Sequence, residues 1–293
     1  MIVITGAAGF IGSNIYQSLK NDYKIIRVDF DDECVDPYDF LDRLKDPEFA
    51  SSISAILHQG ACTDTMCYDV KYMMDRNLEY SMELFKLCMK QNIRLIYAST
   101  AALYGDGPDF KETDIHSPKN VYAVSKSLFD QYVESFLETG INNQVVGLRY
   151  FNVYGPGEHR KGKMSSVLHQ FKNQIDQTGK IKLFENSSEY RRDFIYVDDV
   201  VSVNKHFLQN EKISGIFNCG TGQPHSFLDI ANYLGEIIDL EINYVPMPFM
   251  LKEKYQEYTC ANLNKLREIG KYDKNFLDPK KGIARYRAFW DGK

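Results

Sequence analysis

The sequence predicts the α/β class: a doubly wound, parallel β-sheet with a smaller mixed α/β domain beside it. The first observation is a set of short apolar runs, rich in β-branched residues, at 2–5, 24–29, 53–58, 93–98 and 144–150. The second is that longer stretches of helical periodicity separate these runs. Strands that alternate with helices are typical of a parallel sheet covered by helices on both faces. This alternation ends near residue 156, which predicts a second, mixed unit.

The overall composition is ordinary for a globular protein. The 293 residues are 44% hydrophobic and 26% charged, and their net charge is −5. A mildly acidic balance gives no general attraction to nucleic acid or to an anionic membrane, so neither is an expected partner. The chain opens without the basic region or cleavage site of a signal peptide, and no apolar run reaches transmembrane length. We therefore expect a soluble, cytoplasmic protein.

The cysteines and histidines indicate no metal centre. The six cysteines include no Cys-x-x-Cys pair, and the six histidines include no His-x-x-x-His pair. Several of the cysteines fall inside apolar runs, where cysteine behaves as a small core residue. We expect neither a metal site nor a disulfide, which suits a reducing compartment.

A glycine-rich loop follows the first strand. Gly6, Gly9 and Gly12 stand between the run at 2–5 and a helical pattern. Glycine allows the tight turn, the close approach of the backbone to a pyrophosphate, and close packing of helix on strand. Free N–H groups at the start of the helix then face the phosphates. This order of strand, loop and helix predicts a Rossmann-type dinucleotide site. The helix is expected to carry Ile11, Ile15 and Leu19 on one face.

The second strand, 24–29, ends on Asp29. An acidic residue roughly 20 positions after the glycine loop bonds the adenosine ribose hydroxyls in such sites. The alternative is an aspartate that only ends a strand. Phe30 and three acidic residues, Asp31, Asp32 and Glu33, follow, with no lysine or arginine before Arg43. Such a pocket repels a 2′-phosphate, which favours NAD over NADP.

The third strand and the helix after it are predicted to border the same site. The run at 53–58 leads into small residues at 59–63, which can pass close to a cofactor. His58 could be functional there, although a hydrogen-bonded histidine at a strand end is the commoner case. The helix near 69–90 carries Asn77.

Thr100, Tyr122 and Lys126 carry the predicted chemistry. Thr100 follows the strand at 93–98, and ligands collect at the carboxyl ends of parallel strands. Tyr122 and Lys126 are four residues apart, hence on one face of a helix. An ammonium there would stabilise the phenolate and bring its pKa down from about 10. Most such pairs lie on solvated helix faces, but beside a dinucleotide site this one predicts an acid–base centre.

The second half of the chain is less regular. A basic loop at 158–163 precedes a helix near 164–177, and Arg191 is followed directly by Arg192. Two adjacent arginines can form a surface patch, or they can grip a diphosphate through bidentate hydrogen bonds. We expect a terminal helix near 279–290.

Two domains are predicted from these patterns. Residues 1–155 and 193–222 are assigned to a dinucleotide-binding domain, and residues 156–192 and 223–293 to a substrate domain. We interpret 217–222 as a tight turn.

Together these motifs resemble the extended short-chain dehydrogenase/reductases that act on nucleotide sugars, the NAD-dependent epimerase/dehydratase family. Within it, the chain is similar over nearly its whole length to the branch of ADP-heptose 6-epimerases. The stretches that carry this resemblance are His58-Gln-Gly-Ala-Cys62, Lys71-Tyr-Met-Met-Asp75, Arg149-Tyr-Phe-Asn-Val-Tyr-Gly-Pro156, Lys182-Leu-Phe-Glu185 and Lys254-Tyr-Gln256. The last three lie in the substrate half and therefore inform on the sugar.

The resemblance implies roles for individual residues. Tyr122 and Lys161 are the two acid/base residues, and Lys126 contacts the cofactor. From its place at the strand end, Thr100 could bond the oxygen being oxidised. Besides the loop glycines and Asp29, the implied cofactor residues are Phe10, Ile11, Phe30, Gln59, Gly60, Ala61, Cys62, Thr63, Asn77, Lys126 and Val153. The implied ADP-sugar residues are Asn152, Lys163, Gln170, Phe184, Glu185, Asn186, Ser187, Arg192 and Tyr255.

The implied activity is inversion of C6 of an ADP-heptose, in heptose supply for lipopolysaccharide core, through transient oxidation to a 6-keto sugar. One NAD per subunit would stay tightly bound and be recycled, since no net redox change occurs. Inversion needs proton donors on two sides, which accounts for a second acid/base residue. The resemblance also implies a homo-oligomer, a pentamer if the chain follows the family.

The chain departs from the family at several positions. Arg76 stands where an asparagine is usual, Lys163 and Gln170 replace a serine and a histidine, and the loop after Asp29 is shortened. These changes leave the sugar and one cofactor contact open.

Other functions remain possible on sequence alone. A 4,6-dehydratase is disfavoured because Ala101 and Ala102 stand where that subfamily has an Asp-Glu pair. A hexose 4-epimerase would share the three catalytic groups. A non-catalytic dinucleotide-binding protein would have no need for all three.

Overall fold

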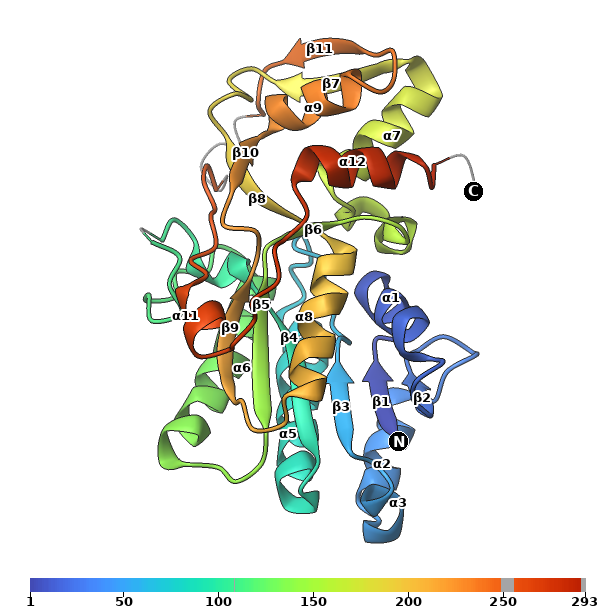
Figure 1. Ribbon diagram of the computed structural model, residues 1–293, viewed down its shortest axis with the longest axis vertical. Helices are drawn as coiled ribbons and strands as arrows, with labels where there is room; N and C mark the ends of the chain where they lie inside the picture. Colours follow the sequence, from blue (N-terminus) through green and yellow to red (C-terminus); the bar gives the residue numbers. More distant parts are fainter. Residues whose placement is uncertain (108, 249–255, 291–293) are drawn as a thin grey trace.

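The computed structural model describes residues 1–107, 109–248 and 256–290. Six strands form one sheet in the order β2-β1-β3-β4-β5-β9, and each pairing in it is parallel (Figure 1). The strands are β1 (Ile2–Thr5), β2 (Ile25–Val28), β3 (Ala55–His58), β4 (Arg94–Thr100), β5 (Val145–Tyr150) and β9 (Gly215–Cys219). The predicted doubly wound parallel sheet is confirmed.

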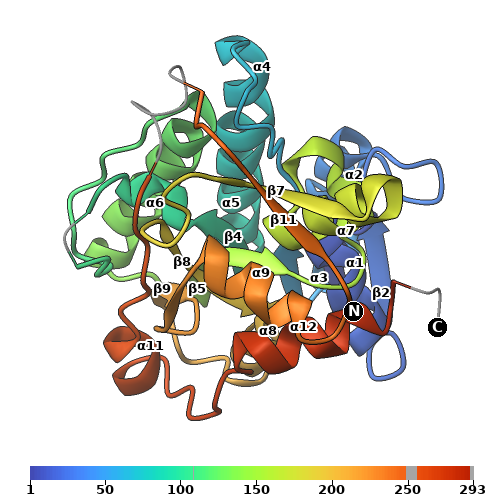
Figure 2. The same cartoon turned by 90° about the horizontal axis from the view of Figure 1, so that it is seen from above.

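The alternation of side chains along β1 divides the core of this sheet between two faces. Ile2 and Ile4 pack in a cluster with Val200 and Phe207, while Val3 packs on the other side in a cluster with Phe129. Successive strand side chains point to opposite faces, so both faces of a buried strand need apolar cover. One face is covered by α1 (Phe10–Leu19) and α8 (Val197–Gln209). The other is covered by α2 (Pro37–Leu44), α3 (Pro47–Ser51), α5 (Tyr80–Gln91) and α6 (Val121–Thr139). Figure 2 shows α5 and α6 on one side of the sheet and α8 on the other.

The single helix predicted near 69–90 contains an irregularity. It begins as α4 (Val70–Met74), continues as a π-helical turn, η1 (Asp75–Glu79), and ends as α5. A π-helical turn fits one extra residue into a helix and shifts the direction of the side chains on it. The sequence pattern did not predict this turn.

The interpretation of 217–222 as a tight turn is wrong for its first half. Phe217 and Cys219 belong to β9, which pairs with β5 through partners such as Leu148 and Phe217. All three apolar side chains of β9, Ile216, Phe217 and Cys219, are buried, and this burial favours a sixth strand. A short run that is apolar on both faces cannot be told from a loop segment by periodicity alone.

The smaller sheets lie beyond the carboxyl ends of the six parallel strands (Figure 1). β10-β8-β6 form a mixed three-stranded sheet, and β11-β7 a parallel pair. Their strands are β6 (Asn152–Tyr154), β7 (Lys180–Phe184), β8 (Arg191–Tyr196), β10 (Pro224–Ser226) and β11 (Glu241–Val245). The remaining helical segments of the described ranges are η2 (Ala101–Tyr104), η3 (Glu158–Met164), α7 (Val167–Thr178), α9 (Phe227–Gly235), α11 (Asn264–Glu268) and α12 (Pro279–Arg287).

The helix expected near 279–290 therefore ends earlier, at Arg287. Side chains of α7, α9 and α12 share a separate buried cluster with the smaller sheets. The exact residues at which the chain divides into two domains stay a prediction. Within the described ranges, no helix is both long enough and apolar enough to cross a membrane.

Candidate active site

One large cleft collects most of the predicted residues. Its volume is about 1810 Å³, and its floor includes the carboxyl ends of five neighbouring strands through Gly6, Asp29, Gln59, Thr100 and Tyr150. Sites for one small ligand rarely exceed roughly 1,000 Å³. The cleft therefore has room for two ligands of nucleotide size, and it lies where open parallel sheets bind their ligands.

The glycine loop has the geometry that a pyrophosphate requires. Gly6 has a φ of +66°, and a Cβ on it would meet the Gly60 backbone nitrogen at 2.6 Å. A Cβ on Gly12 would lie 2.1 Å from the Gly6 carbonyl oxygen. Gly9 precedes α1 without a side-chain cap, so the first N–H groups of the helix are left for a ligand. The loop fits the phosphates of a dinucleotide.

Asp29 stands at the end of β2 as predicted. Its Oδ2 accepts from the Ala8 backbone N–H at 2.8 Å, and its Oδ1 accepts from the Phe30 N–H at 2.8 Å. These bonds orient the carboxylate at the edge of the cleft, and each oxygen keeps lone-pair capacity for a further donor. Such a carboxylate suits ribose hydroxyl groups.

Asn77 supports the loop at 59–63 from below. Its Oδ1 accepts from the Cys62 N–H at 2.7 Å, and its Nδ2 donates to the Cys62 carbonyl at 2.9 Å and to Ser125 Oγ at 3.0 Å. Asn77 is fully buried and does not line the cleft, whereas Gln59 to Thr63 do. Asn77 therefore does not itself face the cleft that was expected to hold the cofactor; it supports the loop that does, and its role toward the cofactor stays a prediction.

His58 is held by hydrogen bonds within the core. Its Nδ1 lies 2.6 Å from Thr5 Oγ1, and its Nε2 lies 2.9 Å from Ser81 Oγ. Burial, together with the charge of Lys126, lowers the pKa of His58 to about 3. The ring is neutral at ordinary pH and links β1, β3 and α5, which is the non-catalytic alternative considered above.

Tyr122 lies in the first turn of α6. Asn120 caps that helix by accepting from the Ala123 N–H at 2.8 Å, which fixes the start of the helix and so the direction of Tyr122. The Tyr122 hydroxyl bonds to the side chain of Thr100, so the two groups expected to meet do meet. Burial raises the pKa of Tyr122, and the hydrogen bond to Thr100 opposes this. The expectation that Lys126 brings this pKa below its usual value is wrong, because burial dominates.

Lys126, one turn further along α6, is buried in the wall of the cleft. Burial lowers its pKa to about 8, and the charge of Asp130 opposes this shift. Asp130 itself accepts from Tyr97 Oη at 3.0 Å, from Ser99 Oγ at 2.9 Å and from Arg149 Nε at 2.8 Å. Lys126 thus rests above a buried carboxylate whose hydrogen bonds are satisfied.

Lys161 reaches the same cleft from η3. Glu158, at the start of η3, accepts from the Gly155 N–H at 2.8 Å and the Ser166 N–H at 2.6 Å, so one buried carboxylate fastens both ends of the turn. Burial lowers the pKa of Lys161, and the charge of Glu158 opposes this. Its Nζ lies 6.0 Å from the centre of the Phe10 ring, next to the glycine loop.

Most of the other predicted residues line the cleft, and a few do not. Among the cofactor set, the loop glycines, Phe10, Ile11, Phe30, Val153 and the run at 59–63 line it. Among the substrate set, Asn152, Lys163, Gln170, Phe184 and Ser187 line it, and Glu185, Asn186 and Arg192 do not. Arg192 is buried and donates to the carbonyl oxygens of Arg191 and Gln256. Tyr255 lies outside the described residues.

Some residues that line the cleft were not predicted. Tyr38, Tyr72 and Arg76 stand near Asp29 and Phe30, and Arg160 donates to the Ala8 carbonyl at 3.1 Å. Tyr72 lies in the stretch Lys71–Asp75 and Arg160 in the basic loop at 158–163, but neither was assigned a role, and Tyr38 neither follows a strand end nor forms a spacing motif. Arg76 entered only as a departure from a family pattern.

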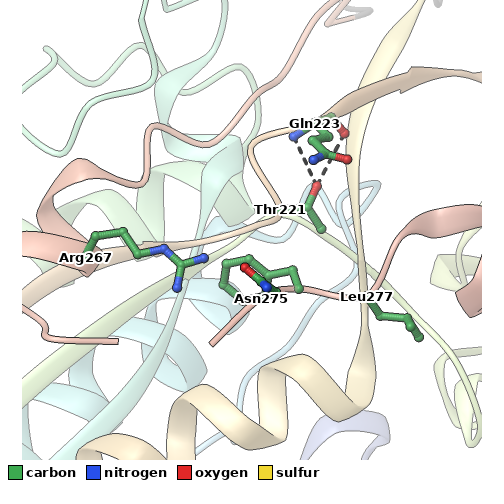
Figure 3. A pocket seen from close by; sticks show the side chains of 6 residues that line it. Thr221, Gln223, Arg267, Asn275 and Leu277 are labelled. Atoms are coloured by element: carbon green, nitrogen blue, oxygen red, sulfur yellow. Dashed lines mark hydrogen bonds between the residues drawn. The ribbon is translucent and has the colours of Figure 1, made fainter. Parts of the chain in front are cut away.

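A second, smaller cavity of about 260 Å³ contains none of the predicted catalytic groups (Figure 3). Two of its polar side chains are bonded locally: Thr221 Oγ1 pairs with the Gln223 backbone, and Arg267 donates to the carbonyl oxygens of Tyr272 and Lys274. The chemistry therefore belongs to the larger cleft. No cluster of histidine, cysteine or acidic side chains suited to a metal ion occurs in the ranges described.

Comparison with known proteins agrees with this geometry. The model of the NAD dependent epimerase/dehydratase family matches residues 2–220. ADP-L-glycero-D-manno-heptose-6-epimerase of Brachyspira hyodysenteriae is 46% identical over 308 positions, covering 98% of this chain and 96% of that protein. The crystal structure of the Helicobacter pylori ADP-L-glycero-D-manno-heptose-6-epimerase superposes with a TM-score of 0.86 at 27% identity, covering 100% of this chain and 96% of the other.

A UDP-N-acetylglucosamine 4-epimerase from Methanobrevibacter ruminantium also gives a TM-score of 0.86, at 21% identity over 99% of this chain and 98% of that one, a likeness of fold alone. The match to the family model spans most of the sequence, and the Brachyspira relative covers nearly all of it. The chain belongs to the NAD dependent epimerase/dehydratase family.

Proposed function

We propose that this protein is an isomerase that inverts C6 of ADP-D-glycero-D-manno-heptose by transient oxidation to a 6-keto sugar. The observation that carries this proposal is that one cleft unites a dinucleotide loop with acid/base groups from two separate elements, Tyr122 on α6 and Lys161 on η3. The names of the Brachyspira and Helicobacter relatives support the choice of sugar and nucleotide.

The residues of the cleft fit NAD as the resident cofactor. The glycine loop would hold the pyrophosphate, Asp29 the adenosine ribose, and Lys126 the nicotinamide ribose. When bound, the nicotinamide supplies a reversible hydride acceptor. We further propose that one NAD per subunit stays tightly bound and is recycled, because an epimerisation has no net redox change.

The residues of this chain supply the proton transfers. Thr100 and Tyr122 are hydrogen-bonded to each other, so together they can hold the substrate hydroxyl and move its proton at the phenol oxygen. Lys161 has a pKa lowered by burial, which makes its amine a usable acid or base nearer neutral pH. A proton donor in each of two positions lets the keto sugar be reduced from either face.

We also propose a diphosphate role for Arg192 and a substrate role for Tyr255, Glu185 and Asn186. Arg192 now donates to backbone carbonyls, so gripping a diphosphate requires it to exchange those partners. A cytoplasmic location and a homo-oligomeric state, a pentamer if the chain follows the family, are proposed from family resemblance.

The deciding experiment incubates the purified protein with a panel of ADP-, UDP- and GDP-sugars and follows new epimers by NMR. The expected result is interconversion of the two C6 epimers of ADP-glycero-manno-heptose. No UDP-hexose is expected to be epimerised. Inversion at C4 of a UDP-hexose would instead identify a hexose 4-epimerase. Tyr122→Phe, assayed in parallel, excludes a contaminating enzyme.

A further inference from the structure

Arg76 lies in a ring of aromatic side chains at one end of the cleft. Its guanidinium carbon is 4.0 Å from the centre of the Phe30 ring, 5.4 Å from Tyr72 and 5.6 Å from Tyr38. All four residues line the cleft at the end where Asp29 stands. The π-helical turn η1 carries Arg76, so the irregularity in the helix presents this side chain to the cleft.

One N–H donor group of the Arg76 guanidinium has no acceptor among the described residues. Its Nη1 is buried and has no hydrogen-bond partner in the described ranges, and no carboxylate described there forms an ion pair with it. A buried N–H without an acceptor is unfavourable, and native structures rarely keep one. A ligand that brings an acceptor to this position would remove the penalty.

The surroundings of Arg76 indicate the chemistry of that ligand. Phe30, Tyr38 and Tyr72 are 55%, 46% and 44% exposed and all line the cleft, so part of each ring is accessible to a ligand there. Two carboxylates, Asp29 and Asp31, line the same end. Aromatic faces and an N–H donor suit a heteroaromatic base with ring-nitrogen acceptors, whereas the carboxylates disfavour an additional phosphate.

We propose that Arg76 recognises the adenine of the dinucleotide, its plane held by Phe30 and its Nη1 donating to a ring nitrogen of the base. This inference rests on the proposed function only in requiring that a dinucleotide binds. It also amends the sequence argument for NAD: the segment after Asp29 lacks a cation, but the fold brings one from η1 to the same place.

The test uses nucleotide-free protein and two fragments of the cofactor. Arg76→Met keeps the length and the apolar contact with Phe30 but removes the N–H donors. Binding of ADP-ribose, measured by calorimetry, is expected to weaken roughly 10- to 100-fold, as for loss of a charge-assisted hydrogen bond. Binding of nicotinamide mononucleotide, which lacks adenine, is expected to stay within about twofold.

Arg43→Met is the matched control, because Arg43 also stacks on a phenylalanine, at 4.3 Å from the Phe49 ring, yet lies outside the cleft. It should change neither affinity. Retained binding of nicotinamide mononucleotide shows that Arg76→Met is folded, and Arg76→Lys, which keeps the charge without the planar fork, should weaken ADP-ribose binding as well.

Three results overturn the proposal. An unchanged ADP-ribose affinity in Arg76→Met would show that Arg76 does not bind the adenine. A loss seen only with 2′-phospho-ADP-ribose assigns Arg76 to a 2′-phosphate instead. Failure of the unmodified protein to bind either fragment overturns the dinucleotide site itself, and with it the proposed function.

Discussion

The two sides of the cleft that carry the proposed acid/base residues are built in opposite ways. Tyr122 and Lys126 stand on α6, a regular helix of 19 residues, above a buried carboxylate, Asp130, that is paired with Arg149. Lys161 stands on η3, a turn of 7 residues held by a single carboxylate, Glu158. Burial lowers the pKa of both lysines, and one nearby carboxylate opposes it in each case. The same electrostatic arrangement thus arises on a regular scaffold and on an irregular one.

Removing the phenol should give the largest effect. Tyr122→Phe keeps the ring and its packing but removes the proton that Thr100 and the substrate share. A general acid–base group contributes about 10²- to 10⁴-fold, so the epimerisation rate is expected to fall by that factor in both directions. Rates are measured by NMR from each pure epimer. Tyr132→Phe, on the same helix, is the control. A Tyr122→Phe rate near that of the unmodified protein would exclude the phenol as an acid–base group.

Removing the amine of Lys161 on η3 should lower the epimerisation rate nearly as much. The loss should differ between the two epimers. Lys161→Met is expected to lower epimerisation about 10²- to 10³-fold while one epimer still forms the keto sugar. The keto sugar is trapped with borodeuteride in a single turnover and measured by mass spectrometry. Lys172→Met, at a partly exposed lysine paired with Asp176, is the control. If Lys161→Met epimerises normally, the two-base mechanism is wrong for this chain.

A substitution that weakens the attachment of η3 but leaves Lys161 in place tests the comparison of the two sides directly. Glu158→Gln keeps the shape but offers one acceptor to two backbone N–H groups, and roughly a tenfold fall in rate is expected. It also removes the anion that supports charged Lys161, so the pKa of Lys161 should fall further. The alkaline limb of the pH–rate profile should therefore move to lower pH. A profile that keeps its position would show that Lys161 does not set this limb.

The buried ammonium of Lys126 is expected to lower the free energy of unfolding. Its folded pKa is about 8 against 10.5 ordinarily, so the unfolded chain binds more protons between these values, and this group's contribution to stability rises with pH across that window. At pH 7, Lys126→Met is expected to stabilise nucleotide-free protein by about 1–3 kcal/mol. The gain should shrink toward pH 10. Urea unfolding of both proteins measures it, and a destabilised variant at pH 7 would contradict the prediction.

The regular side of the cleft was the more predictable one. A strand, the glycine loop and a helix follow one another in sequence, and Tyr122 and Lys126 are one helical turn apart, so local rules placed them. Lys161 was reached only through family resemblance, since a basic loop carries no period. Residues 217–219 were misassigned because a short run with buried side chains on both faces needs its partner β5 to be recognised as a strand.

By itself, the sequence determined the parallel sheet, the dinucleotide loop and the helix face that bears Tyr122, because these depend on spacing and turn chemistry. Only the tertiary structure decided that Asn77 supports Cys62 from below, that burial raises the pKa of Tyr122, and that Arg76 meets Phe30. Each of these is a property of side chains that come together from different elements or of the low-polarity surroundings they create. Spacing along the chain contains neither of these.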